Sequence, residues 1–304
     1  MLTVFLSRSD VSRHTQALHL LPELGEALKL RTKGPSSRRL DLEAPGRDGA
    51  TVVRTAALEG VPAYAVTTQV RQGDGSSRAV LQLHDGPTGK LLALMDAGHS
   101  RALRASLVGA LSADALARPD ARHVAVLGSG AAAIGALKAL RLVRSVEQVW
   151  LFEADLARSF ELALHLQATL SMAVRGAPTA AAAVAEADIV LLTGEETLPS
   201  DSVKRGAHVA VLGAESFPTC PLPPETLERA RRFCDEPETS PRWGPPFQLS
   251  LGGVLRGDDP GRTSPDEVTL FASTGPAFLD LIVAWHVYQG ARDDDELTRL
   301  DLEA

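Results

Sequence analysis

Hydrophobic residues in the middle of the chain form short, mostly apolar runs that are separated by alanine-rich stretches. The runs comprise four segments: His123–Leu127, Val149–Phe152, Ala187–Leu192 and Ala207–Leu212. A short apolar run with little polar alternation is typical of a strand that is buried on both faces. The stretches at 131–143 and 156–172 have the composition of helices. This alternation predicts a Rossmann-type, doubly wound α/β domain built on a parallel sheet.

The two ends of the chain show a different pattern. Short apolar or alternating segments, separated by turn sequences, predict strands at 63–70, 79–84 and 91–95. Ser9-Asp10 predicts the cap of a helix that runs through Leu18, Leu21, Leu24 and Leu28. A second helix over 100–117 ends before a proline. We expect little regular structure between 237 and 265. A helix at 276–288 is followed by an acidic end, which predicts a solvated tail.

The sequence VLGSGAAA at 126–133 is the clearest local signal for a bound dinucleotide. It follows a predicted strand and opens a predicted helix, which is the context that the phosphate-binding turn requires. Two glycines permit the tight turn and the close approach of backbone to a pyrophosphate, and an alanine stands at the third glycine position. The helix N-terminus adds unpaired N–H groups and a positive dipole end. We expect the contacts to come from five residues: Gly128, Ser129, Gly130, Ala131 and Ala132.

The ends of two neighbouring strands add further candidates for this site. Glu153 stands where an acidic residue accepts hydrogen bonds from the adenosine ribose, and its charge favours NAD over NADP. Thr193 ends the run at 187–192, whose carboxyl end should face the cofactor crevice. Glu195 and Glu196 follow directly, and two carboxylates beside a pyrophosphate weigh against cofactor binding unless they lie on a solvated loop. NAD is therefore a candidate cofactor whose binding the sequence leaves open.

Composition and charge exclude several classes of protein. The chain has 304 residues, enough for two domains, and a formal net charge of −7, which gives no basic surface for nucleic acid. Its apolar runs are too short to span a bilayer, and its first residues lack a signal-peptide pattern. The two cysteines and eight histidines show no metal-ligand spacing. We expect a cytoplasmic protein with reduced thiols, no bound metal and no membrane or nucleic-acid partner.

Four stretches spread over the chain carry a resemblance to a known family. They are 85–118, the turn at 126–133, GAHVAVLGAE at 206–215 and GRTSPDEVTLFASTGPAFLDLIVAWHVYQGA at 261–291. The first is similar to a D-x-x-T-G…A-x-M-D-G…R-T-x-A segment, and the third to G-x-H-x-x-x-x-G-A-D. By these motifs the chain resembles the ornithine cyclodeaminase/mu-crystallin family.

The resemblance implies an architecture and a class of chemistry. It places a substrate-binding and dimerisation domain at 1–120 together with 272–304, and a Rossmann dinucleotide-binding domain at 121–271. It implies a homodimer. It also implies NAD(P)-linked chemistry on amino acids or cyclic imines, including imine reduction, amino-acid oxidation and cyclodeamination.

The family's catalytic residues match this chain unevenly. Arg104 corresponds to an arginine that grips the substrate carboxylate, and Arg38 or Arg39 corresponds to an earlier one. The family's K-x-V-T strand matches best at 64–67, which puts Tyr64 in the place of a lysine. Glu215 replaces the family's aspartate, and the added methylene shifts its carboxylate. Two smaller candidates are Asp280, which matches a family aspartate or serves as a structural partner, and His99, a proton carrier or a polar helix-start residue.

Two functional hypotheses follow from these departures. Because no lysine occurs between 33 and 90, the pocket lacks the cation that the resemblance implies. On that ground we favour a non-catalytic protein that binds a peptide or an amino-acid-derived biosynthetic intermediate. The alternative is an NAD(P)-dependent oxidoreductase of an amino acid or cyclic imine, in which Tyr64 donates a hydrogen bond and Glu215 acts as acid or base.

Overall fold

The structure, a computed structural model, divides into two compact units. It describes residues 2–30, 37–43, 49–72, 77–128, 130–194, 196–214, 219–237, 243 and 246–302. Unit 1 comprises Met1–Arg104 and Pro276–Ala304, and unit 2 comprises Ala105–Gly275. The junctions therefore fall inside helix α3 (Ala97–Leu116) and directly before helix α9 (Ala277–Ala291), whereas the sequence placed them at 120 and 272.

Unit 2 is built on an eight-stranded sheet in which all pairs are parallel. Its strands are β7 (His123–Leu127), β8 (Gln148–Phe152), β9 (Ala173–Gly176), β10 (Ile189–Leu192), β11 (His208–Leu212), β12 (Arg231–Cys234), β13 (Leu249–Ser250) and β14 (Thr269–Ser273). Their order is β13-β12-β14-β11-β10-β7-β8-β9. The central strands β10 and β11 are buried along their whole length, which explains their unbroken apolar runs.

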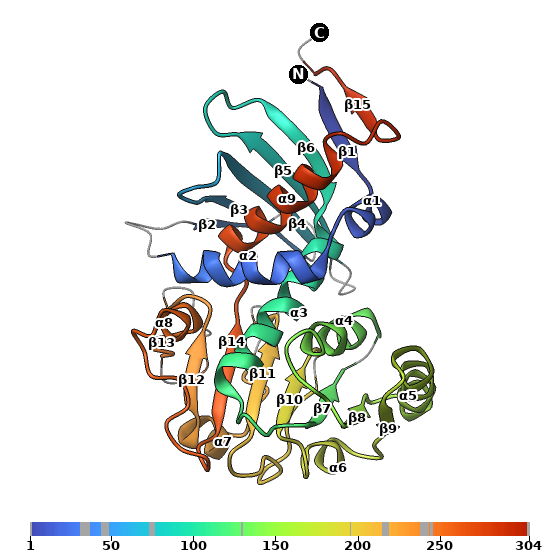
Figure 1. Cartoon of the computed structure of the whole chain (residues 1–304), viewed down its shortest axis with the longest axis vertical. Coiled ribbons are helices and arrows are strands. Elements are labelled where there is room, and N and C mark those ends of the chain that lie inside the picture. Colours follow the sequence, from blue (N-terminus) through green and yellow to red (C-terminus); the bar gives the residue numbers. More distant parts are fainter. Residues whose placement is uncertain are drawn as a thin grey trace. The chain divides into compact units, whose positions relative to one another are not determined.

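The path of the chain through this sheet fixes where a ligand can bind. From β7 the chain runs outward through β8 and β9, and then returns to β10 on the other side of β7 (Figure 1). This reversal is the topological switch point of a doubly wound sheet, so the predicted fold class is confirmed. The helices of unit 2 are α4 (Gly130–Leu140), α5 (Leu156–Leu170), α6 (Ala180–Val184), α7 (Pro224–Arg229) and α8 (Leu251–Arg256), together with most of α3.

The stretch from 237 to 265 is more regular than its sequence indicated. It contains β13, which pairs with β12, and the short helix α8. Ser250 caps α8 through a hydrogen bond from the backbone N–H of Gly253, and Gly257 ends it in the left-handed conformation. The prediction of little regular structure agrees with the rest of the described residues; the two elements were missed because both are too short to establish a hydrophobic period.

Unit 1 is built on a seven-stranded mixed sheet. Its strands are β1 (Thr3–Leu6), β2 (Ser37–Glu43), β3 (Gly49–Ala57), β4 (Ala63–Gln72), β5 (Ser77–Asp85), β6 (Leu91–Asp96) and β15 (Thr298–Leu300), in the order β15-β1-β6-β5-β4-β3-β2. The pair β1–β6 is parallel and all other pairs are antiparallel. Helices α1 (Arg8–Arg13), α2 (Ala17–Lys29) and α9 belong to the same unit.

One face of this sheet is covered by α9 and the other is open. Helix α9 packs against β2, β3, β4 and β5, and α2 packs against α9 in turn (Figure 1). Side chains alternate along β4, so that Ala63, Ala65, Thr67 and Gln69 are buried while the residues between them are more exposed. Because α9 lies between the sheet and α2, it is apolar around most of its circumference.

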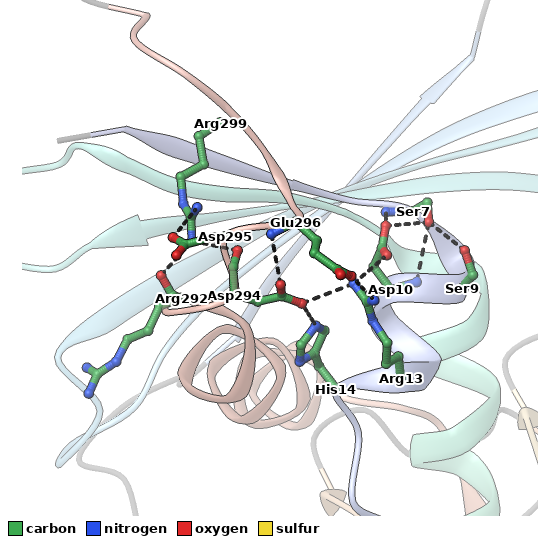
Figure 2. Close-up of polar contacts among 10 residues, drawn as sticks. All are labelled: Ser7, Ser9, Asp10, Arg13, His14, Arg292, Asp294, Asp295, Glu296 and Arg299. Atoms are coloured by element: carbon green, nitrogen blue, oxygen red, sulfur yellow. Dashed lines mark hydrogen bonds and ion pairs between the residues drawn. The ribbon is translucent and has the colours of Figure 1, made fainter.

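The acidic end of the chain is tied to unit 1, whereas its sequence predicted a solvated tail. Strand β15 pairs with β1, and Asp294 lies between two side chains of the α1 region (Figure 2). Arg13 approaches Asp294 at 3.0 Å and Glu296 at 3.1 Å, and His14 Nε2 lies 3.0 Å from Asp294. The backbone N–H of Glu296, together with Arg13, lowers the pKa of Asp294 below its ordinary value. These charges explain why a polar segment is ordered here.

Candidate functional site

The turn after β7 requires glycine at its first position. Gly128 has φ of +120°, and a Cβ there would lie 2.6 Å from both the backbone nitrogen of Gly194 and Oγ1 of Thr193. The strand β7 therefore passes close to the end of β10 without room for any side chain. The N–H of Gly128 donates to the carbonyl oxygen of Phe152 at 2.9 Å, which also ties the turn to β8.

Gly130 meets a different requirement. Its φ is +62°, which favours glycine, but a Cβ there would have no atom within 4 Å. The space beside Gly130 is open, and α4 begins at this residue with its unpaired N–H groups. Ala131 is exposed and Ala132 is half-buried, whereas Ala133 is packed inside. An open, glycine-lined helix N-terminus at a switch point fits a phosphate group. Ser129 lies outside the described residues.

Helix α4 is held close to α3 by a further glycine that the sequence analysis did not single out. A Cβ on Gly135 would lie 2.9 Å from Oγ of Ser106. Ala133, at the third position of the motif, is buried, whereas the close contact between α4 and α3 is at Gly135, two residues later. This packing fixes the direction in which the N-terminus of α4 points.

The ends of β8 and β10 complete this edge of the sheet. Glu153 is only 6% exposed, and Nε of Arg158 lies 3.9 Å from its Oε1. Thr193 binds the carbonyl oxygen of Leu127 through its N–H at 2.8 Å and its hydroxyl at 3.2 Å. Glu196 accepts a hydrogen bond from the N–H of Ala154 at 3.1 Å, so this carboxylate joins two loops. Because Glu196 is used in this contact, its charge is a weaker argument against cofactor binding than the sequence suggested. Glu195 lies outside the described residues.

The residues at this edge fit a dinucleotide. The open turn at Gly130 suits a pyrophosphate, and the buried carboxylate of Glu153 suits the two hydroxyls of a ribose. The predicted set from Gly128 to Ala132, with Glu153 and Thr193, lies at the carboxyl ends of β7, β8 and β10, apart from the undescribed Ser129. The structure therefore brings the predicted nucleotide-binding residues together.

In unit 1, Arg104 forms a buried ion pair with Asp280. Its Nη1 donates to Oδ1 of Asp280 at 2.6 Å, and each side chain is only 2% exposed. Arg104 comes from α3, and Asp280 from the first turn of α9. A guanidinium carries five N–H groups, so this bond is compatible with binding a substrate carboxylate as well.

A second buried arginine in unit 1 escaped the sequence analysis. Nη1 of Arg54 donates to Oε1 of Gln69 at 3.1 Å, and Nε2 of Gln69 donates to Oγ of Ser77 at 2.8 Å. Arg54 and Gln69 are each 5% exposed and lie on the face that α9 covers. A polar residue such as Gln69 at a buried position of an alternating strand could have drawn attention to this contact. The alternating sequence pattern, however, does not say which face of the sheet is covered.

Tyr64 does not join these groups. It lies on the opposite face of β4, where its ring stacks on His84 with the centroids 4.8 Å apart. Arg38, which is exposed, pairs in register with Thr55 and thereby with Val66, so it belongs to the same open face. The structure therefore places both residues on the face of the sheet that α9 leaves open.

The remaining predicted site residues have other outcomes. The side chain of Arg39 and all of Glu215 lie outside the described residues, so their roles stay predictions. His99 lies in the first turn of α3, where its N–H donates to Oδ1 of Asp96 at 2.9 Å. Burial, followed by the charge of Arg8, lowers the pKa of His99 below its ordinary value. A neutral imidazole at a helix start agrees with the structural interpretation of this residue.

The histidine of the G-x-H motif is structural. His208 is fully buried in β11, with Nε2 3.3 Å from Oγ of Ser112 and Nδ1 3.0 Å from Oγ1 of Thr269. Burial, reinforced by the charges of Arg262 and Arg144, lowers its pKa to about 3. A neutral imidazole therefore links α3, β11 and β14.

Two classes of site receive no support from the described parts of the chain. No three His, Cys, Asp or Glu side chains among them come together in a way that could hold a metal ion. Every helix in those ranges is too short or too polar for a bilayer crossing.

Comparisons with known proteins agree with this geometry. A model of the ornithine cyclodeaminase/mu-crystallin family matches residues 1–295. The ketimine reductase mu-crystallin of Mus musculus is 29% identical over 309 residues, which cover 93% of this chain and 96% of the relative.

Solved structures share the fold over nearly the whole chain. Δ(1)-pyrroline-2-carboxylate reductase of Thermococcus litoralis, solved in complex with NADH and L-proline, matches with a TM-score of 0.87 at 22% identity. The matched region covers 98% of this chain and 100% of the reductase chain. An archaeal alanine dehydrogenase dimer with bound NAD has a TM-score of 0.86 at 21% identity, with coverage of 99% and 100%.

These comparisons overturn one sequence-based hypothesis. The non-catalytic, peptide-binding protein was the favoured interpretation, and it is wrong: the matching proteins are named reductases and dehydrogenases, two of them solved with a nicotinamide dinucleotide. The error came from reading the missing lysine at the Tyr64 position as a lost site. That position lies on the face of the sheet that α9 leaves open.

Proposed function

Because the chain belongs to the ornithine cyclodeaminase/mu-crystallin family, we propose that it is an NAD(H)-dependent reductase of an α-imino acid. The substrates to test first are the cyclic imines that correspond to proline and pipecolate. The same site would run the reverse reaction, oxidation of the amino acid. The observation that carries the proposal is the glycine cradle at Gly128 and Gly130 in unit 2, together with the buried Arg104 in unit 1.

In this proposal, one group of residues binds the dinucleotide and another binds the substrate. The N–H groups at the start of α4 hold the pyrophosphate, and the carboxylate of Glu153 accepts hydrogen bonds from the adenosine ribose. Arg104 binds the substrate carboxylate, which orients the reacting carbon. When bound, NADH supplies the hydride.

The choice of NADH over NADPH rests on Glu153. Its carboxylate is buried at the end of β8, where a 2′-phosphate would meet a like charge in a region shielded from water. We therefore expect a large preference for NADH.

The open face of the unit 1 sheet supports a homodimer. Leu40, Val70 and Val80 lie on this face and are 56%, 43% and 44% exposed. Apolar side chains gathered on an uncovered sheet face favour burial against a partner. A second copy of this chain is the partner we propose, and a related fold has been solved as a dimer. Light scattering of the wild-type protein should give the dimer mass, and Val80→Glu should shift it toward the monomer.

Steady-state kinetics test the proposed activity. Purified protein is mixed with NADH or NADPH and with Δ(1)-pyrroline-2-carboxylate or its six-membered homologue, and the nicotinamide absorbance is followed. We expect imine-dependent oxidation of NADH, and formation of the matching amino acid. Failure of every imine with both coenzymes would refute the proposal.

A further inference from the structure

Asp280 has one carboxylate oxygen that the protein does not use. Oδ1 accepts the 2.6 Å hydrogen bond from Arg104, whereas Oδ2 is buried without a hydrogen-bond partner among the described residues. Asp280 as a whole is 2% exposed, so bulk water does not replace the missing donor. The unused acceptor therefore lies at the same ion pair to which the proposed function assigns the substrate carboxylate.

An unused buried acceptor is costly, and the cost points to an absent donor. A buried carboxylate oxygen loses its hydration, and without a replacement it lowers stability by much more than an ordinary hydrogen bond contributes. The position in the first turn of α9 offsets part of this cost, because the helix dipole favours a negative charge there. It does not supply a donor to Oδ2. A ligand that brings an N–H group would complete the coordination.

The pair Arg104–Asp280 matches the two polar groups of an α-imino or α-amino acid. A guanidinium recognises the carboxylate, and a carboxylate recognises the protonated nitrogen on the neighbouring carbon. On the basis of the proposed function, we propose that Oδ2 of Asp280 accepts a hydrogen bond from the α-nitrogen of the substrate and selects an imine over the corresponding 2-oxo acid.

The contact between Oδ2 of Asp280 and the substrate nitrogen would favour the reduction of an imine. The reactive form of the imine is protonated, and a carboxylate beside the nitrogen stabilises that cation. Hydride leaves the reduced nicotinamide and bonds to the imine carbon; the C=N π electrons become a lone pair on nitrogen, which keeps its proton. The imine is reduced to the amine and the dinucleotide is oxidised. A 2-oxo acid presents a carbonyl oxygen to Oδ2, where two acceptors repel each other.

The kinetic test uses Asp280→Asn, which keeps the shape of the side chain. The amide keeps an oxygen for Arg104 and offers an N–H in place of the other acceptor. We expect kcat/KM for Δ(1)-pyrroline-2-carboxylate to fall about tenfold to 100-fold, and the ratio of that value to kcat/KM for 2-oxopentanoate to fall by at least as much. Equal losses for both substrates, or no change, would overturn the inference while leaving the proposed function intact.

A matched control is available in unit 2. Asp188 is also a buried aspartate, but it is fully used by Arg118, Lys204 and two backbone N–H groups. Asp188→Asn should lower the melting temperature and leave the ratio of imine to 2-oxo acid reduction unchanged. If it changed that ratio as much as Asp280→Asn, selection by Asp280 would be refuted.

Equilibrium binding separates this inference from the proposed activity. In the presence of NAD, calorimetry compares L-proline and L-pipecolate with their ring-oxygen isosteres, which lack the N–H group. We expect the wild type to prefer the amino acids by about tenfold or more, and Asp280→Asn to lose the preference. This result would support the role of Asp280 even if no turnover occurred. An equal affinity for amino acids and isosteres, or binding of neither, would overturn it.

Discussion

Arg54 and Gln69 lie on adjacent strands of unit 1 and are joined by a 3.1 Å hydrogen bond beneath α9. The guanidinium that donates this hydrogen bond comes from β3, and the amide oxygen that accepts it comes from β4. The protein thus keeps a cation on the covered face of this sheet although β4 itself contains no lysine. The guanidinium of arginine is the most basic of the protein side chains, so an arginine supplies this positive charge without a lysine.

Replacing Gln69 should destabilise unit 1. Gln69→Leu removes one acceptor of a buried guanidinium, the one described by the 3.1 Å hydrogen bond, and we expect the free energy of unfolding to fall by about 1–3 kcal/mol. The measurement is a urea titration, with Gln72→Leu at the exposed end of β4 as the control, for which we expect a change below about 0.5 kcal/mol. Similar curves for the two variants would show that the Arg54–Gln69 contact carries little energy.

Tyr64 should tolerate the loss of its hydroxyl. Because its ring stacks on His84 on the open face, Tyr64→Phe should leave kcat/KM for the imine within about a factor of two of the wild-type value. Steady-state kinetics decide the matter. A loss of tenfold or more would restore Tyr64 as a hydrogen-bond donor in catalysis.

Gly128→Ala should weaken dinucleotide binding strongly. The new Cβ would lie 2.6 Å from the backbone nitrogen of Gly194, so the turn or the end of β10 must move. We expect the Kd for NADH to rise at least tenfold, measured by fluorescence titration. Gly60→Ala is the control, because φ at Gly60 is also positive, at +86°, but its Cβ would meet no atom within 4 Å. It should cost about 1 kcal/mol of stability and leave NADH affinity unchanged. Equal losses of affinity in both variants would refute the steric argument.

Acid should destabilise unit 2 through His208. The pKa of this histidine is lowered from its ordinary value of 6.5 to about 3 in the folded protein, so folding keeps it neutral. Its contribution to stability is fully present above pH 6.5 and declines as the pH falls from 6.5 toward 3. The expected slope from this group is about 1.4 kcal/mol per pH unit in that window.

Unfolding titrations at several pH values measure this slope. His208→Gln keeps hydrogen-bonding groups for Ser112 and Thr269 but removes the titration. The variant should lose stability at neutral pH and show a shallower decline between pH 6.5 and 4. A variant as acid-sensitive as the wild type would exclude His208 as the cause.

The sequence predicts unit 2 better than unit 1, for physical reasons. Strands β7, β8, β10 and β11 are buried on both faces, so their apolar runs stand out, and the glycines of the turn are dictated by backbone geometry. Strand β2 begins in a polar stretch, and β15 is held by charges of distant parts of the chain, such as Arg13, which no local pattern reveals.

Strand β4 shows how one position in an alternating strand changes the face on which a side chain lies. Tyr64 and Gln69 are on the same strand but on opposite faces, and only the packing of α9 decides which face is buried. The matching of sequence motifs pointed to Tyr64, which lies on the open face, whereas the buried polar contact of this strand is the one between Gln69 and Arg54. Likewise, the ion pair of Arg104 with Asp280 joins residues 176 positions apart in the chain.

Transfer of a labelled hydride tests the central claim most directly. NADH that carries deuterium on both hydrogens of its reactive carbon is incubated with the protein and Δ(1)-pyrroline-2-carboxylate or its six-membered homologue, and the amino acid is analysed by mass spectrometry. An NADH-dependent imine reductase predicts a product with a single deuterium on its α-carbon, formed by the wild type and formed more slowly by Gly128→Ala at the same NADH concentration. Unlabelled product, or no product above a protein-free control, would contradict it.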